Sequence, residues 1–65
     1  MKRRDLISHL TRQGCVLHRV GARHSVFFNP ENGRMATVPR HREIEILLAR
    51  KICRQLDISL PKSGA

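Results

Sequence analysis

Two turn signals divide the middle of the chain into three short β-type segments. One is Gly21-Ala22, and the other is the stretch 30–33, which ends in Asn-Gly. Asn-Gly tolerates the positive φ angles that hairpin turns demand. The expected strands are residues 15–19, 23–28 and 34–38, and connections this short can only join antiparallel neighbours. The sequence therefore predicts a three-stranded antiparallel meander.

Amphipathic patterns flank the meander on both sides. Residues 3–13 carry one apolar stripe at helical spacing, and Gly14 follows where a helix commonly ends. A second helical pattern covers about residues 45–55, with acidic residues at its start and basic residues toward its end, which complements the helix dipole. Only these helices can cover one face of the sheet. We predict an α+β fold of order α-β-β-β-α with both helices on one face, as a single domain over residues 1–60 and a flexible tail at 61–65.

Alternation along the strands divides their side chains between the two faces of the sheet. The face covered by the helices is expected to hold Cys15, Leu17, Phe27, Ala36 and Val38. The opposite, open face is expected to hold His18, His24, Val26, Phe28, Met35 and Thr37. His24 is thus predicted to stand on the open face, next to Arg23 and near an aromatic ring.

The chain is strongly basic, because 13 Lys and Arg residues stand against 5 Asp and Glu residues, for a formal net charge of +8. Most of the cations are arginines, whose planar guanidinium group matches phosphate. This charge indicates nucleic-acid binding. An acidic protein is the alternative partner, and the two do not exclude each other. A domain this small buries only about 60% of its unfolded surface, so any partner that binds the folded form would stabilise it.

Cysteine usage and hydropathy indicate the compartment. The chain has two cysteines, Cys15 and Cys53, and neither a signal peptide nor an apolar run of about 18 residues. We therefore expect a soluble, cytoplasmic protein with reduced thiols and no membrane partner. Both cysteines fall at apolar-periodic positions and are expected to be buried.

Zinc is the metal to consider, because four histidines and two cysteines are enough ligands. However, Cys15 and His18 are three positions apart and point to opposite faces in a strand, and the chain has no Cys-x₂-Cys pair. Buried cysteines are also poor nucleophiles. We expect no metal site and no cofactor.

An ordered set of short motifs resembles HicA-type toxins over about residues 2–60. The set consists of the first helix, Gly14-Cys15-Val16-Leu17, Arg23-His24-Ser25, Asn29-Pro30, Thr37-Val38-Pro39-Arg40-His41 and Leu48-Ala49-Arg50-Lys51-Ile52-Cys53-Arg54-Gln55-Leu56. The resemblance implies a double-stranded-RNA-binding-domain-like fold, which agrees with the predicted order of elements. It also implies the toxin of a type II toxin–antitoxin system, an mRNA endoribonuclease that a cognate HicB-type antitoxin protein holds inactive in a hetero-oligomer.

The same resemblance implies which residue is catalytic. In the family, the catalytic histidine follows a glycine turn at the start of the second strand, within a Gly-Ser-His pattern. The histidine at that position in this chain is His24. Ala22-Arg23 stands in place of Gly-Ser, and Gly21 lies one position earlier. Arg23 is therefore expected to make a phosphate contact where the usual pattern has serine.

RNA carries its own nucleophile, the 2′-hydroxyl group, so its cleavage requires no metal or cofactor. A histidine can perform either proton transfer, typically for a gain of about 10²–10⁴-fold, and arginines can stabilise the charge that develops on the phosphate. His24 is thus the predicted general acid or base, and the predicted products are a 2′,3′-cyclic phosphate and a 5′-hydroxyl. The residues expected to contact RNA are Arg19, Arg23, Ser25, Arg40 and His41.

Two other functions fit the same residues. In the first, His24 is an exposed strand residue that binds RNA without chemistry, and the domain is a non-catalytic RNA-binding module of the same fold. In the second, the domain is a basic adaptor that acts through protein contacts alone. Cleavage that depends on His24, while RNA binding does not, would separate the nuclease from both.

Overall fold

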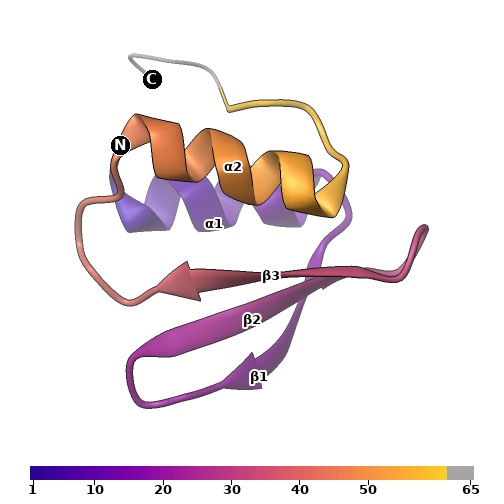
Figure 1. Cartoon of the computed structure of the whole chain (residues 1–65), viewed down its shortest axis with the longest axis horizontal. Helices are drawn as coiled ribbons and strands as arrows, with labels where there is room; N and C mark the ends of the chain where they lie inside the picture. Colours follow the sequence, from indigo (N-terminus) through magenta and orange to yellow (C-terminus); the bar gives the residue numbers. More distant parts are fainter. Residues whose placement is uncertain (62–65) are drawn as a thin grey trace.

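The computed structural model describes residues 1–61 and has the element order that the sequence predicts (Figure 1). Helix α1 spans Arg3–Arg12 and helix α2 spans Ile46–Leu56. Between them lie strands β1 (Val16–Val20), β2 (His24–Asn29) and β3 (Arg34–Pro39). The strands form one antiparallel sheet in the order β1-β2-β3. The predicted α+β fold is therefore confirmed.

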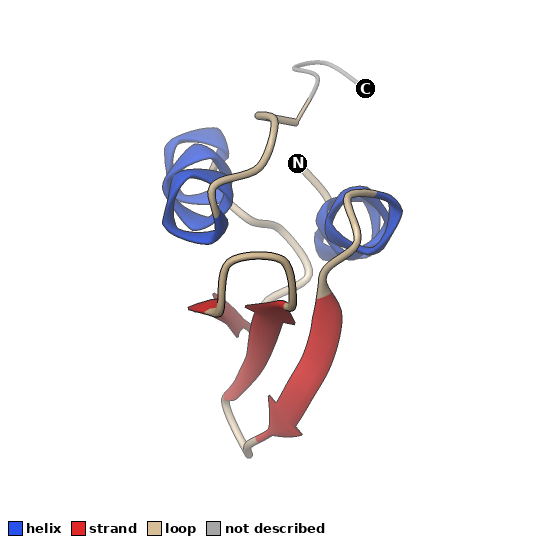
Figure 2. Cartoon of the chain, turned by 90° about the vertical axis from the view of Figure 1, so that its right-hand side faces the viewer, coloured by secondary structure: helices blue, strands red, loops and turns tan. Residues whose placement is uncertain are grey.

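Both helices lie on the same face of the sheet, and the core fills the space between the two layers (Figure 2). Each helix contributes apolar side chains three or four positions apart, the spacing that places them on one helical face. The core consists of Leu6, Leu10, Cys15, Phe27, Ala36, Val38, Ile44, Ala49, Ile52, Cys53 and Leu56. The expected burial of both cysteines is confirmed.

Strand β1 departs from the expected pattern, because every one of its residues is exposed. Leu17 pairs with the buried Phe27, yet it is 52% exposed. Figure 1 shows the reason: β1 is the edge strand farthest from the two helices, so its side chains have no covering layer. The pairing of β1 with β2 also shifts register between Leu17 and Arg19, as at a β-bulge. The prediction that Leu17 belongs to the core is wrong.

Two asparagines fasten the β2–β3 turn to the end of α2. The side-chain amides of Asn29 and Asn32 both donate hydrogen bonds to the carbonyl oxygen of Leu56, at 2.9 and 3.0 Å. The oxygen of each side chain accepts a hydrogen bond from the backbone of the turn two residues later. These bonds satisfy a carbonyl group that the helix end leaves without an intrahelical partner.

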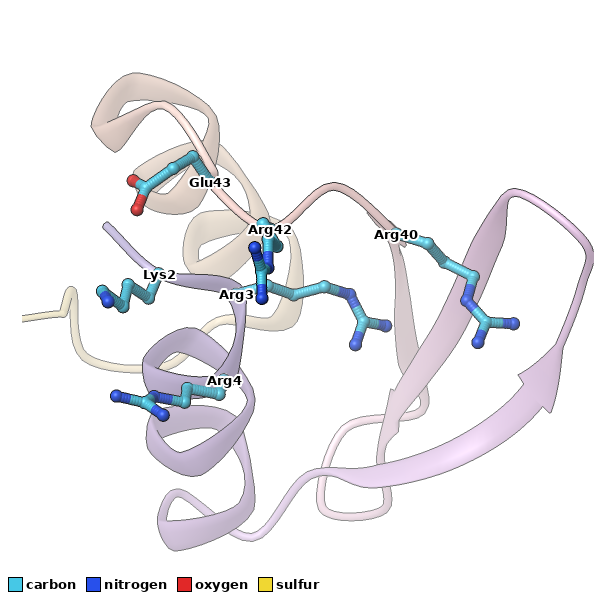
Figure 3. Close-up of a pocket in the computed structure, with 6 residues that line it drawn as sticks. All are labelled: Lys2, Arg3, Arg4, Arg40, Arg42 and Glu43. Carbon is cyan, nitrogen blue, oxygen red and sulfur yellow. The ribbon is translucent and has the colours of Figure 1, made fainter.

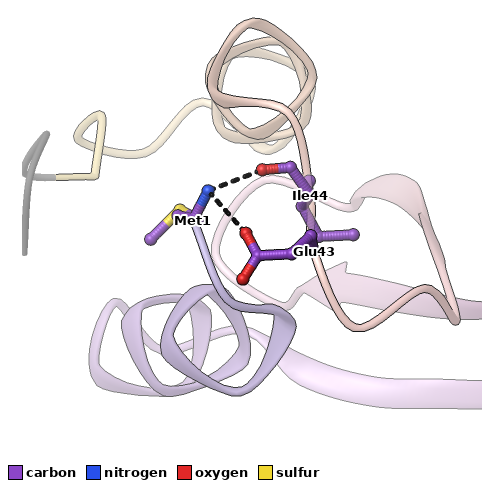
Figure 4. A network of polar contacts seen from close by, with 3 residues as sticks. All are labelled: Met1, Glu43 and Ile44. Atoms are coloured by element: carbon purple, nitrogen blue, oxygen red, sulfur yellow. Dashed lines mark hydrogen bonds and ion pairs between the residues drawn. The ribbon is translucent and has the colours of Figure 1, made fainter.

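The chain start pairs with the loop that precedes α2. Backbone hydrogen bonds run from Arg3 N–H to the Arg42 oxygen and from Ile44 N–H to the Met1 oxygen, both at 2.8 Å. The amino group of Met1 donates to the Ile44 carbonyl oxygen at 2.7 Å and lies 3.7 Å from the Glu43 carboxylate (Figure 4). This pairing brings the cations that begin α1 next to those of the β3–α2 loop.

The C-terminal segment lies against α1 in the part that the structure describes. The imidazole Nε2 of His9 lies 2.7 Å from the Ser59 carbonyl oxygen, and Ile58 packs against the core. Pro61, the first residue of the predicted tail, is buried, and residues 62–65 lie outside the described residues. Neither α1 nor α2 has the length and apolar character that crossing a membrane requires.

Candidate nucleic-acid interface

His24 opens β2 and stands on the face of the sheet that the helices leave uncovered. Along β2 the side chains of Ser25, Phe27 and Asn29 are buried, whereas Val26 and Phe28 are partly exposed and His24 is exposed. This alternation is the one that the sequence predicts for a strand covered on one side. Neither ring nitrogen of His24 takes part in a hydrogen bond or ion pair with the described residues, so both are available to a ligand.

Two adjoining hollows surround His24. The first, here called the His24 hollow, is lined by Ala22, Arg23, His24, Arg40 and His41. The second, the open-face hollow, is lined by Arg19, Gly21, Ala22, Arg23, His24, Val26 and Thr37. The two share Ala22, Arg23 and His24. The structure therefore brings together every residue that was predicted to contact RNA, except Ser25.

The turn before His24 is held closed by a short backbone hydrogen bond. The Gly21 N–H donates to the His24 carbonyl oxygen at 2.7 Å. A Cβ atom at position 21 would lie 3.1 Å from that same oxygen, closer than ordinary contact, so a side chain there would make the turn shift by a few tenths of an ångström. Gly21 thus fixes the backbone from which the His24 side chain projects.

Arg40 holds the same turn from the neighbouring strand end. Its backbone N–H donates to the Arg23 carbonyl oxygen at 3.1 Å, and its guanidinium Nη1 donates to the Gly21 carbonyl oxygen at 3.2 Å. The guanidinium carries five N–H donors, so one such bond leaves most of them for an anion. Arg40 therefore both positions the turn and adds positive charge beside His24.

Ser25 faces the other way. It is 3% exposed, and its hydroxyl accepts a hydrogen bond from the Arg3 Nη2 at 3.0 Å. The Arg3 Nε donates to the Pro39 carbonyl oxygen at 2.9 Å. Ser25 follows His24 in β2, and Pro39 of β3 is the residue that pairs with His24 across the sheet. Arg3 therefore joins β2 and β3 at the level of His24. A buried, hydrogen-bonded hydroxyl has no surface to offer RNA, so the structure gives Ser25 a structural role instead of the expected contact.

Arg3 is the residue of this arrangement that the sequence did not reveal. It lies in a run of three cations at the chain start, and its neighbours Lys2 and Arg4 are exposed. The partner atoms lie 22 and 36 positions away. No local pattern distinguishes an arginine that bonds to the sheet from one that is solvated, so only the fold identifies Arg3 as the bonded one.

His18 lies at the bulge of β1, away from the two hollows. Its ring centroid is 6.0 Å from that of Phe28, with the rings tilted by 39°. This distance is within the range of aromatic pairs. His18 does not line either hollow that holds His24.

The cysteines and acidic residues do not form a metal or thiol site among residues 1–61. No group of three or more His, Cys, Asp or Glu side chains is placed to hold a metal ion in that range. Burial raises the pKa of Cys15, and burial together with Cys15 raises the pKa of Cys53 to about 11. Both thiols therefore stay protonated near neutral pH, and the protonated form is not the nucleophile.

Comparison with known proteins identifies a family. The family model described as HicA toxin of bacterial toxin-antitoxin matches residues 3–58. This range runs from the first residue of α1 to just beyond α2, and it includes both hollows around His24. No curated protein and no solved structure matches the chain.

Proposed function

The chain belongs to the HicA toxin family of bacterial toxin–antitoxin systems, and on that basis we propose that it is a metal-independent mRNA endoribonuclease with His24 as general acid or base. The observation that carries the proposal is the place of His24. It is exposed on the uncovered face of the sheet, its ring nitrogens have no partner among residues 1–61, and Arg23, Arg40 and His41 line the same hollow.

The chemistry follows from what RNA supplies. The 2′-oxygen attacks the adjacent phosphorus as its proton leaves, the bond from phosphorus to the 5′-oxygen breaks, and that oxygen gains a proton. His24 performs one of these two proton transfers. The products are a 2′,3′-cyclic phosphate and a 5′-hydroxyl, and the atoms balance without any co-reactant.

The arginines supply the electrostatic part. Arg23 and Arg40 flank His24, and Arg19 extends the positive charge along the open-face hollow. Guanidinium groups fixed around a phosphate stabilise the charge that develops during the reaction. His41 lines the hollow from the β3–α2 loop and is proposed as a further phosphate contact. Ser25 is assigned to the support of β2 through Arg3 and not to RNA.

The membership in a toxin–antitoxin family implies an antitoxin partner. We propose that this partner is a HicB-type protein that forms a hetero-oligomer with the toxin and blocks access to His24. The toxin without its antitoxin would meet its mRNA substrate in the cytoplasm. A small basic domain also gains stability from a partner that binds its folded form.

The alternative function is a non-catalytic RNA-binding module. A comparison of two substrates distinguishes this module from the nuclease. We would incubate the purified protein in EDTA with a single-stranded RNA and with the same sequence made entirely of 2′-deoxy nucleotides, and analyse the ends of any products. The proposed function predicts cleavage of the RNA alone, with 2′,3′-cyclic phosphate and 5′-hydroxyl ends. Binding of the RNA with no cleavage would favour the module. Cleavage of both substrates would exclude attack by the 2′-hydroxyl.

A further inference from the structure

A third hollow lies beside the start of α1 and is even more basic than the two around His24. It is lined by Lys2, Arg3, Arg4, Arg40, Arg42 and Glu43 (Figure 3). The lining comes from two segments, the first residues of the chain and the loop after β3, which the backbone bonds of Arg3 and Ile44 hold side by side. We refer to it as the N-terminal hollow.

Most cations of the N-terminal hollow have no hydrogen-bond or ion-pair partner among residues 1–61. Arg3 is partly buried and bonded to Ser25 and Pro39. By contrast, the exposed side chains of Lys2, Arg4 and Arg42 form no hydrogen bond or ion pair with any described residue. Glu43, the one carboxylate of the lining, faces the amino group of Met1 at 3.7 Å. Several like charges in one hollow repel each other, and a bound polyanion would remove that cost.

The hollow adjoins the candidate site at Arg40. This residue lines both the N-terminal hollow and the His24 hollow. In Figure 3, Arg42 and Arg3 lie between Arg40 on one side and Lys2 and Arg4 on the other. An RNA strand with a phosphate at His24 could therefore pass Arg40 and continue along a lining in which five of the six residues are cations. The positive end of the α1 dipole, at Lys2 and Arg3, adds to the attraction for phosphate.

We propose that the N-terminal hollow is a second phosphate-binding subsite, which holds the RNA backbone on one side of the cleaved bond through Lys2, Arg4 and Arg42. The inference rests on the proposed function only in taking RNA as the ligand. It adds that the toxin binds several nucleotides around the bond it cleaves, and that very short RNAs bind weakly because they cannot occupy both subsites.

The test measures RNA binding without cleavage. In a His24→Ala background, we would compare the triple variant Lys2→Gln, Arg4→Gln, Arg42→Gln with a control triple, Arg12→Gln, Arg34→Gln, Arg54→Gln. Both remove three charges, but none of the control residues lines any of the three basic hollows. Fluorescence anisotropy would give the affinity over a range of salt concentrations, for single-stranded RNAs of about 4 to 16 nucleotides, the range of site sizes of small single-strand binders.

We expect the slope of log affinity against log salt to be shallower in the hollow triple, its magnitude smaller by about 2, because each lost phosphate contact removes about 0.7 on a single strand. The affinity of the parent should rise with RNA length, and in the hollow triple this rise should stop at a shorter length. The control triple should keep the parent's slope and length dependence. Equal slopes for the two triples would overturn the inference and would leave an acidic protein as the occupant of the hollow.

Two further readouts keep the result interpretable. Circular dichroism checks that each triple is folded, and Arg42→Gln alone, at an exposed loop residue without side-chain bonds to residues 1–61, should lower the slope by about 0.7. A toxin that cleaves RNA but shows equal slopes for both triples retains the proposed function without this subsite. If the protein never cleaves RNA, but the hollow triple shows a weaker salt dependence of RNA binding than the parent, the subsite is supported and the nuclease function is not.

Discussion

The guanidinium group of Arg3 donates a hydrogen bond of 3.0 Å to the hydroxyl of Ser25, so the first turn of α1 is bonded to the residue that follows His24. The same guanidinium reaches the carbonyl oxygen of Pro39, the residue opposite His24 on β3. Helix α1 therefore fixes the position of His24 from the covered face of the sheet, although the helix does not itself reach the open face. This relationship makes Arg3 a positioning residue for the proposed reaction.

Removal of the Arg3 side chain should cost both stability and rate. Arg3→Gln leaves the buried Ser25 hydroxyl without its donor, for a loss of about 1–3 kcal/mol in the free energy of unfolding. We expect kcat for RNA cleavage to fall by roughly tenfold, below the ~10²-fold that a 1 Å misplacement can cost. KM should change less than kcat, because the Arg3 guanidinium is bonded to Ser25 and Pro39. Urea unfolding and steady-state kinetics measure the two effects.

A double-mutant cycle with Ser25→Ala supplies the control for this prediction. If the two side chains act together, the losses from Arg3→Gln and Ser25→Ala will not add, and the coupling energy will be about 0.5 kcal/mol or more. Strictly additive losses would show that Arg3 does not support Ser25.

Gly21→Ala should impair cleavage more than folding. The new Cβ atom would lie 3.1 Å from the His24 carbonyl oxygen, so the turn that carries His24 must shift by a few tenths of an ångström. Gly33→Ala is the matched control, because Gly33 has a φ of +76° and no neighbouring atom within 4 Å of its added Cβ. That variant should lose about 1–2 kcal/mol of stability from backbone strain alone and keep its activity while folded. A loss of cleavage in both variants would point to destabilisation as the shared cause.

Asn29 should matter more for stability than Asn32, although both donate to the Leu56 oxygen. Asn29 is 4% exposed whereas Asn32 is exposed. Asn29→Ala should therefore cost about 1–3 kcal/mol, the penalty of a lost buried partner, and Asn32→Ala about 0.5–1.5 kcal/mol. Asn29→Asp should be the most damaging of the three, because a carboxylate cannot donate to the carbonyl. Chemical denaturation ranks the variants, and an equal effect at the two positions would refute this reading of the turn.

Stability should decline in alkaline solution because of the buried thiols. The pKa of Cys53 rises from 9.0 to about 11 on folding, so the unfolded chain releases this proton at lower pH than the folded chain does. The stabilisation that comes from keeping Cys53 protonated in the folded state is fully present below pH 9 and is lost as the pH rises through about 11. At about 1.4 kcal/mol per pKa unit, the free energy of unfolding should fall by roughly 1–3 kcal/mol over this range. Cys53→Ala should flatten the curve between these pH values even though it lowers stability overall. An unchanged slope in that variant would assign the effect to other groups.

The sequence predicts most of β2 and of the turn before it. Alternation separates His24 and Val26 from Ser25 and Phe27, and the structure places them on opposite faces as expected. The same rule fails for Leu17, which has the right parity but lies in an edge strand beyond the reach of the helices. Alternation assigns a face, whereas burial also depends on which strands the helices cover, and that property belongs to the whole fold.

The candidate site shows the same division. Arg23 and His24 are predicted from local motif and residue type, and the structure places Arg19, Arg40 and His41 in the hollows around His24. Which arginine supports the site and which one remains available to phosphate cannot be predicted from a run such as Lys2-Arg3-Arg4, because three neighbours of the same charge differ only in the partners that the fold brings to them.

The most direct measurement is the rate at which the purified protein and its His24→Ala variant cleave a long single-stranded RNA in EDTA, with RNA binding measured for both. His18→Ala is the control, because it removes an exposed histidine from the neighbouring strand outside both hollows around His24. We predict that His24→Ala loses at least about 10²-fold of the cleavage rate, as expected for a general acid or base, and keeps its RNA affinity, while His18→Ala cleaves as the parent does. Equal cleavage by the parent and His24→Ala would contradict the assignment of His24.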